Sequence, residues 1–155
     1  MLGTQVRRAF DFFGVVLCLL AAFSPPAWCA EYRSVSETAT VLYDAPSSKS
    51  KRLFVLGAGY PVEVMVAVEG WTKVRDVAGT IGWVDARSLN AKRTLIVRPE
   101  VAEVRSSPEP GAPVAYKVAR GVLLEWVETL PGGWTRVRHA DAGAGFLLSA
   151  ELWGS

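Results

Sequence analysis

The sequence has little of what catalysis and metal binding usually require. Its 155 residues include two cysteines and one histidine, and the Gly-x-Ser-x-Gly motif of serine hydrolases is missing. Cys18 and Cys29 both lie in the first thirty residues, so the rest of the chain has His139 as its one imidazole and no thiol. Metal sites need clustered histidine, cysteine or carboxylate ligands. We therefore expect no enzyme, no metal and no cofactor.

Long apolar runs are absent except at the N-terminus. There Arg7-Arg8 precedes an apolar run of twelve residues from Phe12 to Phe23. A basic start followed by a short apolar stretch is typical of a signal peptide, and the run is shorter than the roughly 20 residues of a membrane-spanning helix. We therefore expect residues 1–30 to be a cleaved signal peptide, with cleavage after Cys29 and after Ala30 both open. The mature protein is expected in the periplasm, without stable membrane insertion.

A strong excess of one charge sign is also missing. The whole chain carries 17 basic and 15 acidic residues. Loss of residues 1–30 removes Arg7, Arg8 and Asp11, so fifteen basic and fourteen acidic residues remain. Proteins that bind nucleic acid through their overall field carry a clear basic excess. We therefore expect no nucleic-acid partner.

The most informative feature that the sequence does contain is an internal repeat. The segment Glu69–Val84 contains Gly-Trp-Thr-Lys-Val-Arg and then Gly-Trp-Val, and Pro131–Leu147 contains Gly-Trp-Thr-Arg-Val-Arg and then Gly-Phe-Leu. The offset is 63 residues here and 62 residues upstream, so the second copy has one extra residue at Pro131-Gly132. A period near sixty exceeds the roughly 20–50 residues of solenoid repeats. We expect two docked domains, copy one (38–91) and copy two (94–155).

Both copies show the patterns of strands. Tyr60–Val68 and Trp71–Asp76 are rich in β-branched and aromatic residues and flank a turn at Glu69-Gly70. Alternation predicts that every second residue of the first strand faces the core; these are Val62, Val64, Val66 and Val68. The matching parity of copy two holds Trp126, which we expect to be a core residue. About five short strands in each copy predict an all-β fold of two small closed barrels, with Thr94–Val97 as an added strand.

The central strand of each copy places an aromatic residue and cations on its outward face. In copy one these residues are Trp71, Lys73 and Arg75. An outward indole offers an apolar surface, and neighbouring cations attract carboxylates. The alternative is that each tryptophan covers the barrel edge or packs against the other copy. The candidate ligand-binding residues are Tyr43, Trp71, Lys73, Arg75, Trp83, Arg105, Trp134, Arg136 and Arg138.

Several further polar and aromatic positions are interpreted as structural. Glu63 and Glu125 occupy one position in the two copies, and we expect both to be solvated strand residues. His139 aligns with Asp76, and we expect it at the exposed end of the central strand. Trp153 follows the last strand and is expected to close the bottom of copy two.

The repeated motifs resemble the bacterial SH3-like domain. Val104-Arg105-Ser106-Ser107-Pro108 is similar to the first-strand pattern of that family, Gly133–Val137 to its central Gly-Trp strand, and Gly82-Trp83-Val84 to its later Gly-Trp-Val motif. The resemblance covers residues 38–153. It implies two tandem SH3-like small β-barrels.

A second resemblance, to the opening of eukaryotic SH3 domains, lies at Val41–Ala45. Those domains hold polyproline ligands with several aromatic residues and a proline. The matching positions hold Tyr43, Ala45, Trp71, Asp85 and Ser88 in copy one, and Arg105, Ser107, Trp134, Leu148 and Glu151 in copy two. Most of these aromatics are missing, so we expect no polyproline ligand.

The bacterial family is associated with the cell wall in exported proteins. The resemblance therefore implies a non-enzymatic binding module that recognises peptides or peptidoglycan fragments through shallow grooves. The alternative is a periplasmic structural or assembly protein that uses the same faces to contact an envelope protein.

Overall fold

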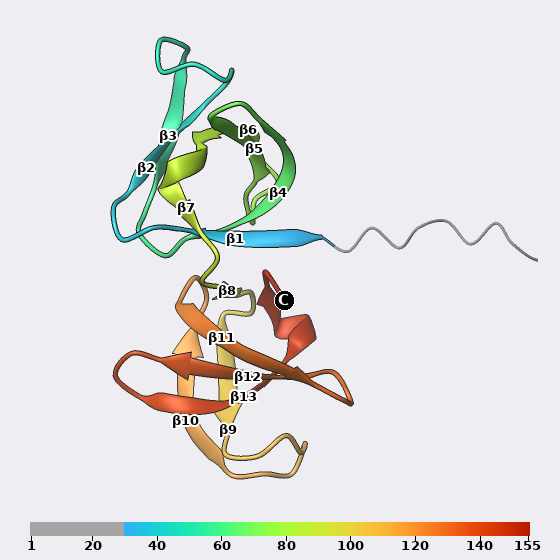
Figure 1. Ribbon diagram of the computed structural model, residues 1–155. Coiled ribbons are helices and arrows are strands. Elements are labelled where there is room, and N and C mark those ends of the chain that lie inside the picture. Colours follow the sequence, from blue (N-terminus) through green and yellow to red (C-terminus); the bar gives the residue numbers. More distant parts are fainter. Residues whose placement is uncertain (1–29) are drawn as a thin grey trace, which may run out of the picture.

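The computed structural model describes residues 30–155, which form one seven-stranded antiparallel sheet in each copy (Figure 1). The predicted signal peptide lies outside the described residues except for Ala30. Within the described part, the helical elements are short 3₁₀ turns, and no helix is long and apolar enough to cross a bilayer. The expected all-β fold is confirmed.

Copy one is built from seven strands that curl around one core. They are β1 (Glu31–Val35), β2 (Thr40–Tyr43), β3 (Arg52–Leu56), β4 (Pro61–Val68), β5 (Trp71–Arg75), β6 (Ile81–Asp85) and β7 (Leu89–Asn90), with the 3₁₀ turn η2 (Ala86–Ser88) before β7. The order in the sheet is β3-β2-β6-β5-β4-β1-β7.

The first sheet thus begins before residue 38, where the sequence pattern places the start of copy one. β1 pairs with β4 and β7, which lie far along the chain. A local reading of the sequence does not reveal such pairing, because no hairpin turn joins β1 to either partner.

Copy two repeats this arrangement strand for strand. Its elements are β8 (Thr94–Val97), β9 (Val101–Arg105), β10 (Val114–Ala119), β11 (Leu123–Leu130), β12 (Trp134–His139), β13 (Gly143–Leu148), η3 (Ser149–Glu151) and β14 (Leu152–Trp153). The order β10-β9-β13-β12-β11-β8-β14 matches copy one when β8 takes the place of β1. The predicted strand Thr94–Val97 is confirmed, and each copy has seven strands instead of about five.

Each copy buries its own set of aliphatic side chains. The core of copy one comprises Val35, Leu42, Leu56, Val62, Val74, Val84 and Leu89. The core of copy two comprises Leu95, Val97, Ala102, Val104, Val118, Leu124, Val137, Leu147 and Leu152. Both domains therefore have the separate core that a complete repeat unit requires.

The strict alternation predicted for β4 is wrong in its second half. Val62 is fully buried, but Val66 and Val68 are each 45% exposed. The pairing register with β5 shifts between Val64 and Val66, and such a bulge turns the following side chains away from the core. In copy two the register shifts after Trp126. The expected core position of Trp126 is reached only in part, because its ring is half-buried against the core. Arg93 Cζ lies 4.6 Å from the centre of that ring.

Two equivalent glycines allow the sheet to close. Tyr43 of β2 pairs with Trp83 of β6, directly beside Gly82. A methyl group on Gly82 would lie 2.6 Å from Leu42 Cγ and 2.8 Å from the Tyr43 carbonyl oxygen. The same crossing occurs in copy two at Gly145, where an added methyl group would meet Val104 and the Arg105 carbonyl. The repeated Gly-aromatic motif is therefore a packing requirement.

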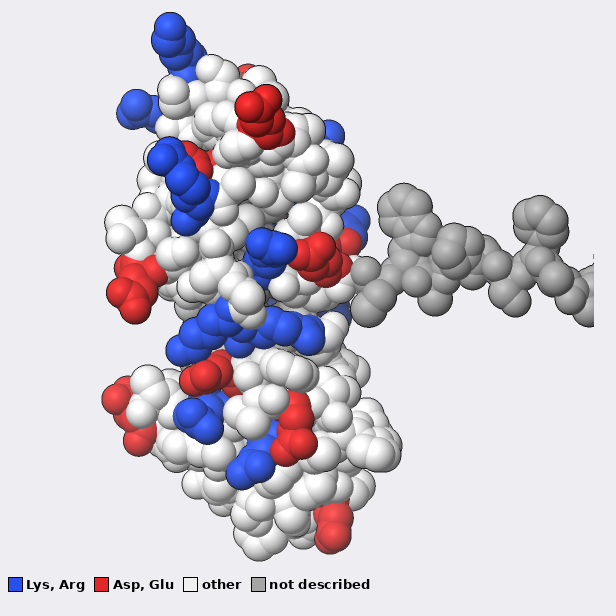
Figure 2. Space-filling view, viewed as in Figure 1, with Lys and Arg blue, Asp and Glu red and all other residues white. Residues whose placement is uncertain are grey.

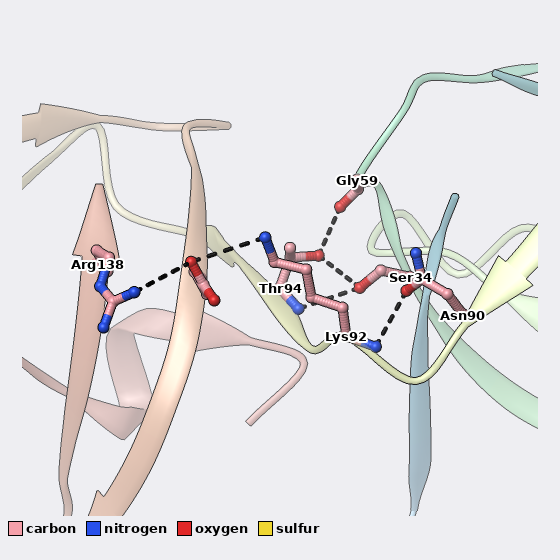
Figure 3. A network of polar contacts seen from close by, with 7 residues as sticks. Ser34, Gly59, Asn90, Lys92, Thr94 and Arg138 are labelled. Carbon is pink, nitrogen blue, oxygen red and sulfur yellow. Dashed lines mark hydrogen bonds and ion pairs between the residues drawn. The ribbon is translucent and has the colours of Figure 1, made fainter. Parts of the chain in front are cut away.

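A polar network joins the two copies at β1 and β8 (Figure 3). Ser34 and Thr94 share a hydrogen bond of 2.7 Å between their hydroxyls, and the Thr94 backbone N–H donates to Ser34 Oγ at 3.0 Å. The Thr94 hydroxyl also donates to the Gly59 carbonyl. Ser34 and Gly59 of copy one are thus hydrogen-bonded to Thr94 of copy two, in agreement with docked domains.

Aromatic residues extend this junction. Trp153 lies edge-to-face against Tyr32 of β1, with ring centroids 5.3 Å apart. Trp153 was expected to follow the last strand, but it belongs to β14. The C-terminal end of the chain lies between the copies (Figure 1), so Trp153 faces copy one. Arg93 fixes that end by donating to the Gly154 carbonyl at 2.9 Å.

The crossing at Gly82 predicts a large effect of a small substitution. Gly82→Ala should lower the free energy of unfolding of copy one by about 1–3 kcal/mol, because the added methyl group overpacks Leu42 and the β2 backbone. Gly57→Ala is the matched control, since a methyl group there meets no atom within 4 Å. Denaturant unfolding measures both, and equal small effects would show that β2 and β6 do not approach closely.

Candidate ligand-binding grooves

Strands β2, β6 and β5 bring the candidate residues of copy one onto one outward face. Tyr43 pairs with Trp83, and Trp83 pairs with Lys73, so these residues form a row across three strands. Their neighbours along the strands, Leu42 and Val84, are fully buried. Because side chains alternate between faces, the row points outward.

Trp71 completes this outward face. Its ring lies edge-to-face against Tyr43, with centroids 5.5 Å apart and planes at 89°. Lys73 Nζ lies 5.8 Å from the centre of the Trp83 ring. Edge-to-face aromatic pairs and a cation over an indole hold these side chains in place without covering them. The result is a half-exposed aromatic surface with one cation.

Asp85 is the acidic neighbour of this surface, opposite Trp71 in the β5–β6 pair. Its carboxylate accepts hydrogen bonds from the Arg87 guanidinium at 2.8 and 3.1 Å and from the Arg87 backbone N–H at 2.9 Å. The side-chain hydrogen bond from Arg87 lowers the pKa of Asp85. Asp85 therefore stays ionised and paired with Arg87, and it leaves Lys73 available.

The same face of copy two is hollowed into a groove of about 590 Å³. Charged side chains line much of it. The lining residues are Val101, Glu103, Arg105, Pro110, Lys117, Gly132, Trp134, Leu148 and Glu151. Arg105, at the position of Tyr43, donates to the Ala112 carbonyl at 2.7 Å and to Glu103 at 3.2 Å. This groove thus combines apolar lining residues with side chains of both charge signs.

Trp134 differs from the half-exposed Trp71 because it is 7% exposed. Both tryptophans were expected on an outward face or covering the barrel edge, and Trp134 is the more covered of the two. The extra residue of copy two lengthens the turn before β12 to Pro131-Gly132-Gly133, and both glycines have φ of 79°. A Gly132 methyl group would lie 3.7 Å from Trp134 Cδ1, so this turn covers the indole.

Comparisons with known proteins agree with this geometry. The family described as bacterial SH3 domain matches residues 36–90 and 98–154. The chain belongs to the bacterial SH3 domain family. A comparison with curated proteins gives no match.

Two solved structures are similar to this tandem of bacterial SH3 domains. One is NlpC1 from Trichomonas vaginalis, with 17% identity and a TM-score of 0.38 over 90% of this chain and 51% of that chain. The other is NlpC2 from the same organism, with 16% identity and a TM-score of 0.38 over 82% and 49%. This chain therefore spans about half the length of each.

Most of the predicted cations of the two SH3 domains are already paired. Arg75 donates to Glu63 Oε2 from two nitrogens at 2.6 and 2.9 Å, and Arg138 lies 4.0 Å from Glu125. Glu63 was expected to be solvated, but its side chain is 16% exposed. Opposite charges directly across a strand pair support the sheet. These arginines therefore contribute to the fold as well as to the outward charge.

Lys73 is the exception among the predicted cations. Arg136 pairs with Glu128 at 3.3 Å and Arg105 with Glu103 at 3.2 Å. Among the ion pairs of residues 30–155, none involves Lys73. Sequence reasoning did not separate Lys73 from the arginines, because their partners lie on neighbouring strands.

His139 has a local structural contact at the end of β12. Its Nδ1 accepts hydrogen bonds from the backbone N–H groups of Asp141 and Ala142 at 3.2 and 3.3 Å. Asp76, the aligned residue of the first SH3 domain, accepts one from the Thr80 N–H at 2.7 Å. The two residues therefore close equivalent turns. Within residues 30–155, no three His, Cys, Asp or Glu side chains are grouped as a metal site would need.

The covered indole of Trp134 predicts unequal stability effects. Trp134→Ala should cost copy two about 3–5 kcal/mol, as deletions of buried aromatic side chains do. Trp71→Ala should cost copy one clearly less, because part of its ring already contacts water. Native-state hydrogen exchange assigns each loss to its copy. A loss for Trp71→Ala as large as that for Trp134→Ala would contradict the difference in burial.

Proposed function

We propose that this chain is an exported, non-enzymatic binding module of the periplasm that holds peptides or peptidoglycan fragments in two shallow grooves. One observation carries the proposal. The groove of copy two is lined by Arg105, Trp134, Leu148 and Glu151, four of the five positions at which SH3 domains would hold a ligand. The equivalent face of copy one presents its aromatic surface at the same place.

Copy one offers a site for an apolar group next to a carboxylate. Trp71, Tyr43 and Trp83 provide half-exposed ring surface, and Lys73 provides a cation without an ion-pair partner among the described residues. Stacking on an aromatic surface tolerates salt, whereas attraction between exposed charges is screened. Binding to copy one should therefore weaken only in part as salt rises.

Copy two offers a different chemistry on the same scaffold. Lys117 and Arg105 both pair with Glu103, at 3.1 and 3.2 Å, and Glu151 adds a second carboxylate to the lining. A ligand with both an amino and a carboxyl group, such as a short peptide, meets charges of both signs there. Two weak sites on docked domains gain from effective concentration when one polymer reaches both.

Sedimentation with purified sacculi tests the proposal. The protein should pellet with sacculi, and Trp71→Ala and Lys73→Ala should each reduce the bound fraction, with Trp71→Ala the stronger because it removes the stacking surface. Lys92→Ala is the matched control, since Lys92 lies in the linker at 3.7 Å from Glu125. Circular dichroism confirms that each variant is folded.

The outcomes separate the two functional classes. Unchanged binding of a folded Trp71→Ala protein would remove the copy one face from the site. Failure of the unmodified protein to sediment with sacculi would favour an assembly role, in which an envelope protein covers the same faces.

A further inference from the structure

The two copies differ sharply at one outer edge of their sheets. β3 and β10 lie at the same edge of their respective sheets. Within the described residues β3 pairs only with β2, and β10 pairs only with β9. The registers coincide: Val41 pairs with Val55 in copy one where Glu103 pairs with Lys117 in copy two. The repeat therefore supplies an internal comparison of two edge strands.

Copy two protects its edge. Lys117 Nζ lies 3.1 Å from Glu103, which places an ion pair across β9 and β10. The neighbouring Tyr116 donates its hydroxyl hydrogen to the Gly143 carbonyl at 2.9 Å, which ties β10 to β13. Lysine on an edge strand is a common device against pairing with foreign strands.

Copy one lacks these devices. Leu53, Phe54 and Val55 are consecutive on β3 and are 36%, 38% and 63% exposed. Two valines, Val41 and Val55, stand where copy two has its ion pair. An edge that combines open backbone N–H and C=O groups with exposed apolar side chains accepts another strand readily. The edge of β3 is therefore suited to strand addition.

The hairpin that carries β3 is also basic. Lys49 and Lys51 of its loop and Arg52, the first residue of β3, form a group that we call the basic tip. None of the three takes part in an ion pair of residues 30–155. Figure 2 shows basic side chains at this end of copy one, remote from copy two. The corresponding loop of copy two, 106–113, has Glu109 as its only charged residue. The basic tip is thus specific to copy one.

We propose that β3 binds an extended segment of a partner protein, in which apolar residues are flanked by acidic ones. The segment pairs with the open backbone edge, its apolar side chains cover Leu53, Phe54 and Val55, and its carboxylates meet the basic tip. An anionic lipid surface would neutralise the cations but leave the backbone edge unpaired. A second copy of this chain that paired through β3 would bring three cations and a single carboxylate, Asp44, which already accepts a hydrogen bond from the Lys51 backbone N–H.

This surface is distinct from the grooves, so the two proposals can fail independently. The probe is a short synthetic peptide of alternating valine and threonine with glutamates at both ends; a second peptide carries lysines in place of the glutamates. Nuclear magnetic resonance titration of the protein should show shifts centred on residues 52–56 with the acidic peptide and at least about tenfold weaker binding of the basic one.

Val55→Lys is the decisive variant because it installs the residue that copy two has at this position. It should weaken binding of the acidic peptide by about tenfold or more, while the protein stays folded. Val114→Lys places a lysine on an exposed apolar position of copy two that does not line the groove, 40% exposed, and should leave binding unchanged.

Three results would overturn the proposal. They are shifts absent from β3, equal binding of the two peptides, and unchanged binding by Val55→Lys. Two more would assign the edge to another occupant: self-association of the peptide-free protein that Val55→Lys abolishes, or binding to anionic phosphatidylglycerol vesicles that the acidic peptide does not displace.

Discussion

The close approach of two backbones at Gly82, and again at Gly145, is the constraint on which both the barrels and the candidate grooves depend. Because no side chain separates β2 from β6, Tyr43 pairs directly with Trp83. That pairing carries Tyr43 to the edge of Trp71 and completes the aromatic face. In copy two the same approach pairs Arg105 with Phe146, and it places the guanidinium beside the groove. The close backbone approach therefore shapes the core on the inner face of the sheet and the candidate groove on the outer face.

The common scaffold then allows the two copies to diverge. Where copy one has Tyr43 and Asp85, copy two has Arg105 and Leu148, so an aromatic face becomes a groove with mixed charge. One inserted residue in the turn before β12 changes the exposure of an indole that the sequence alignment treats as equivalent. The edge strands diverge in the same way, with an ion pair in one copy and valines in the other. The two copies thus share a backbone arrangement and differ in the chemistry of the side chains on it.

Much of the fold was predictable because the repeat, the alternation and the Gly-Trp motifs are local signals that occur twice. The features that the sequence did not predict each have a physical cause. β1 pairs with strands distant along the chain, the bulge after Val64 turns Val66 and Val68 outward, and the glycine turn covers Trp134. Of the candidate site residues, Tyr43, Trp71, Lys73 and Trp83 share one face. The arginine partners were not predicted, because the bulges after Val64 and Trp126 set the register that brings Glu63 opposite Arg75 and Glu125 opposite Arg138.

The central claim is that ligands bind at the outward faces of the SH3 domains and not at the junction between them. The indole N–H resonances of the tryptophans report this directly in a titration with soluble muropeptides. We predict that the signals of Trp71 and Trp83 shift with added ligand while those of Trp126 and Trp153, at the junction, stay in place. Shifts confined to Trp126 and Trp153 would contradict the account.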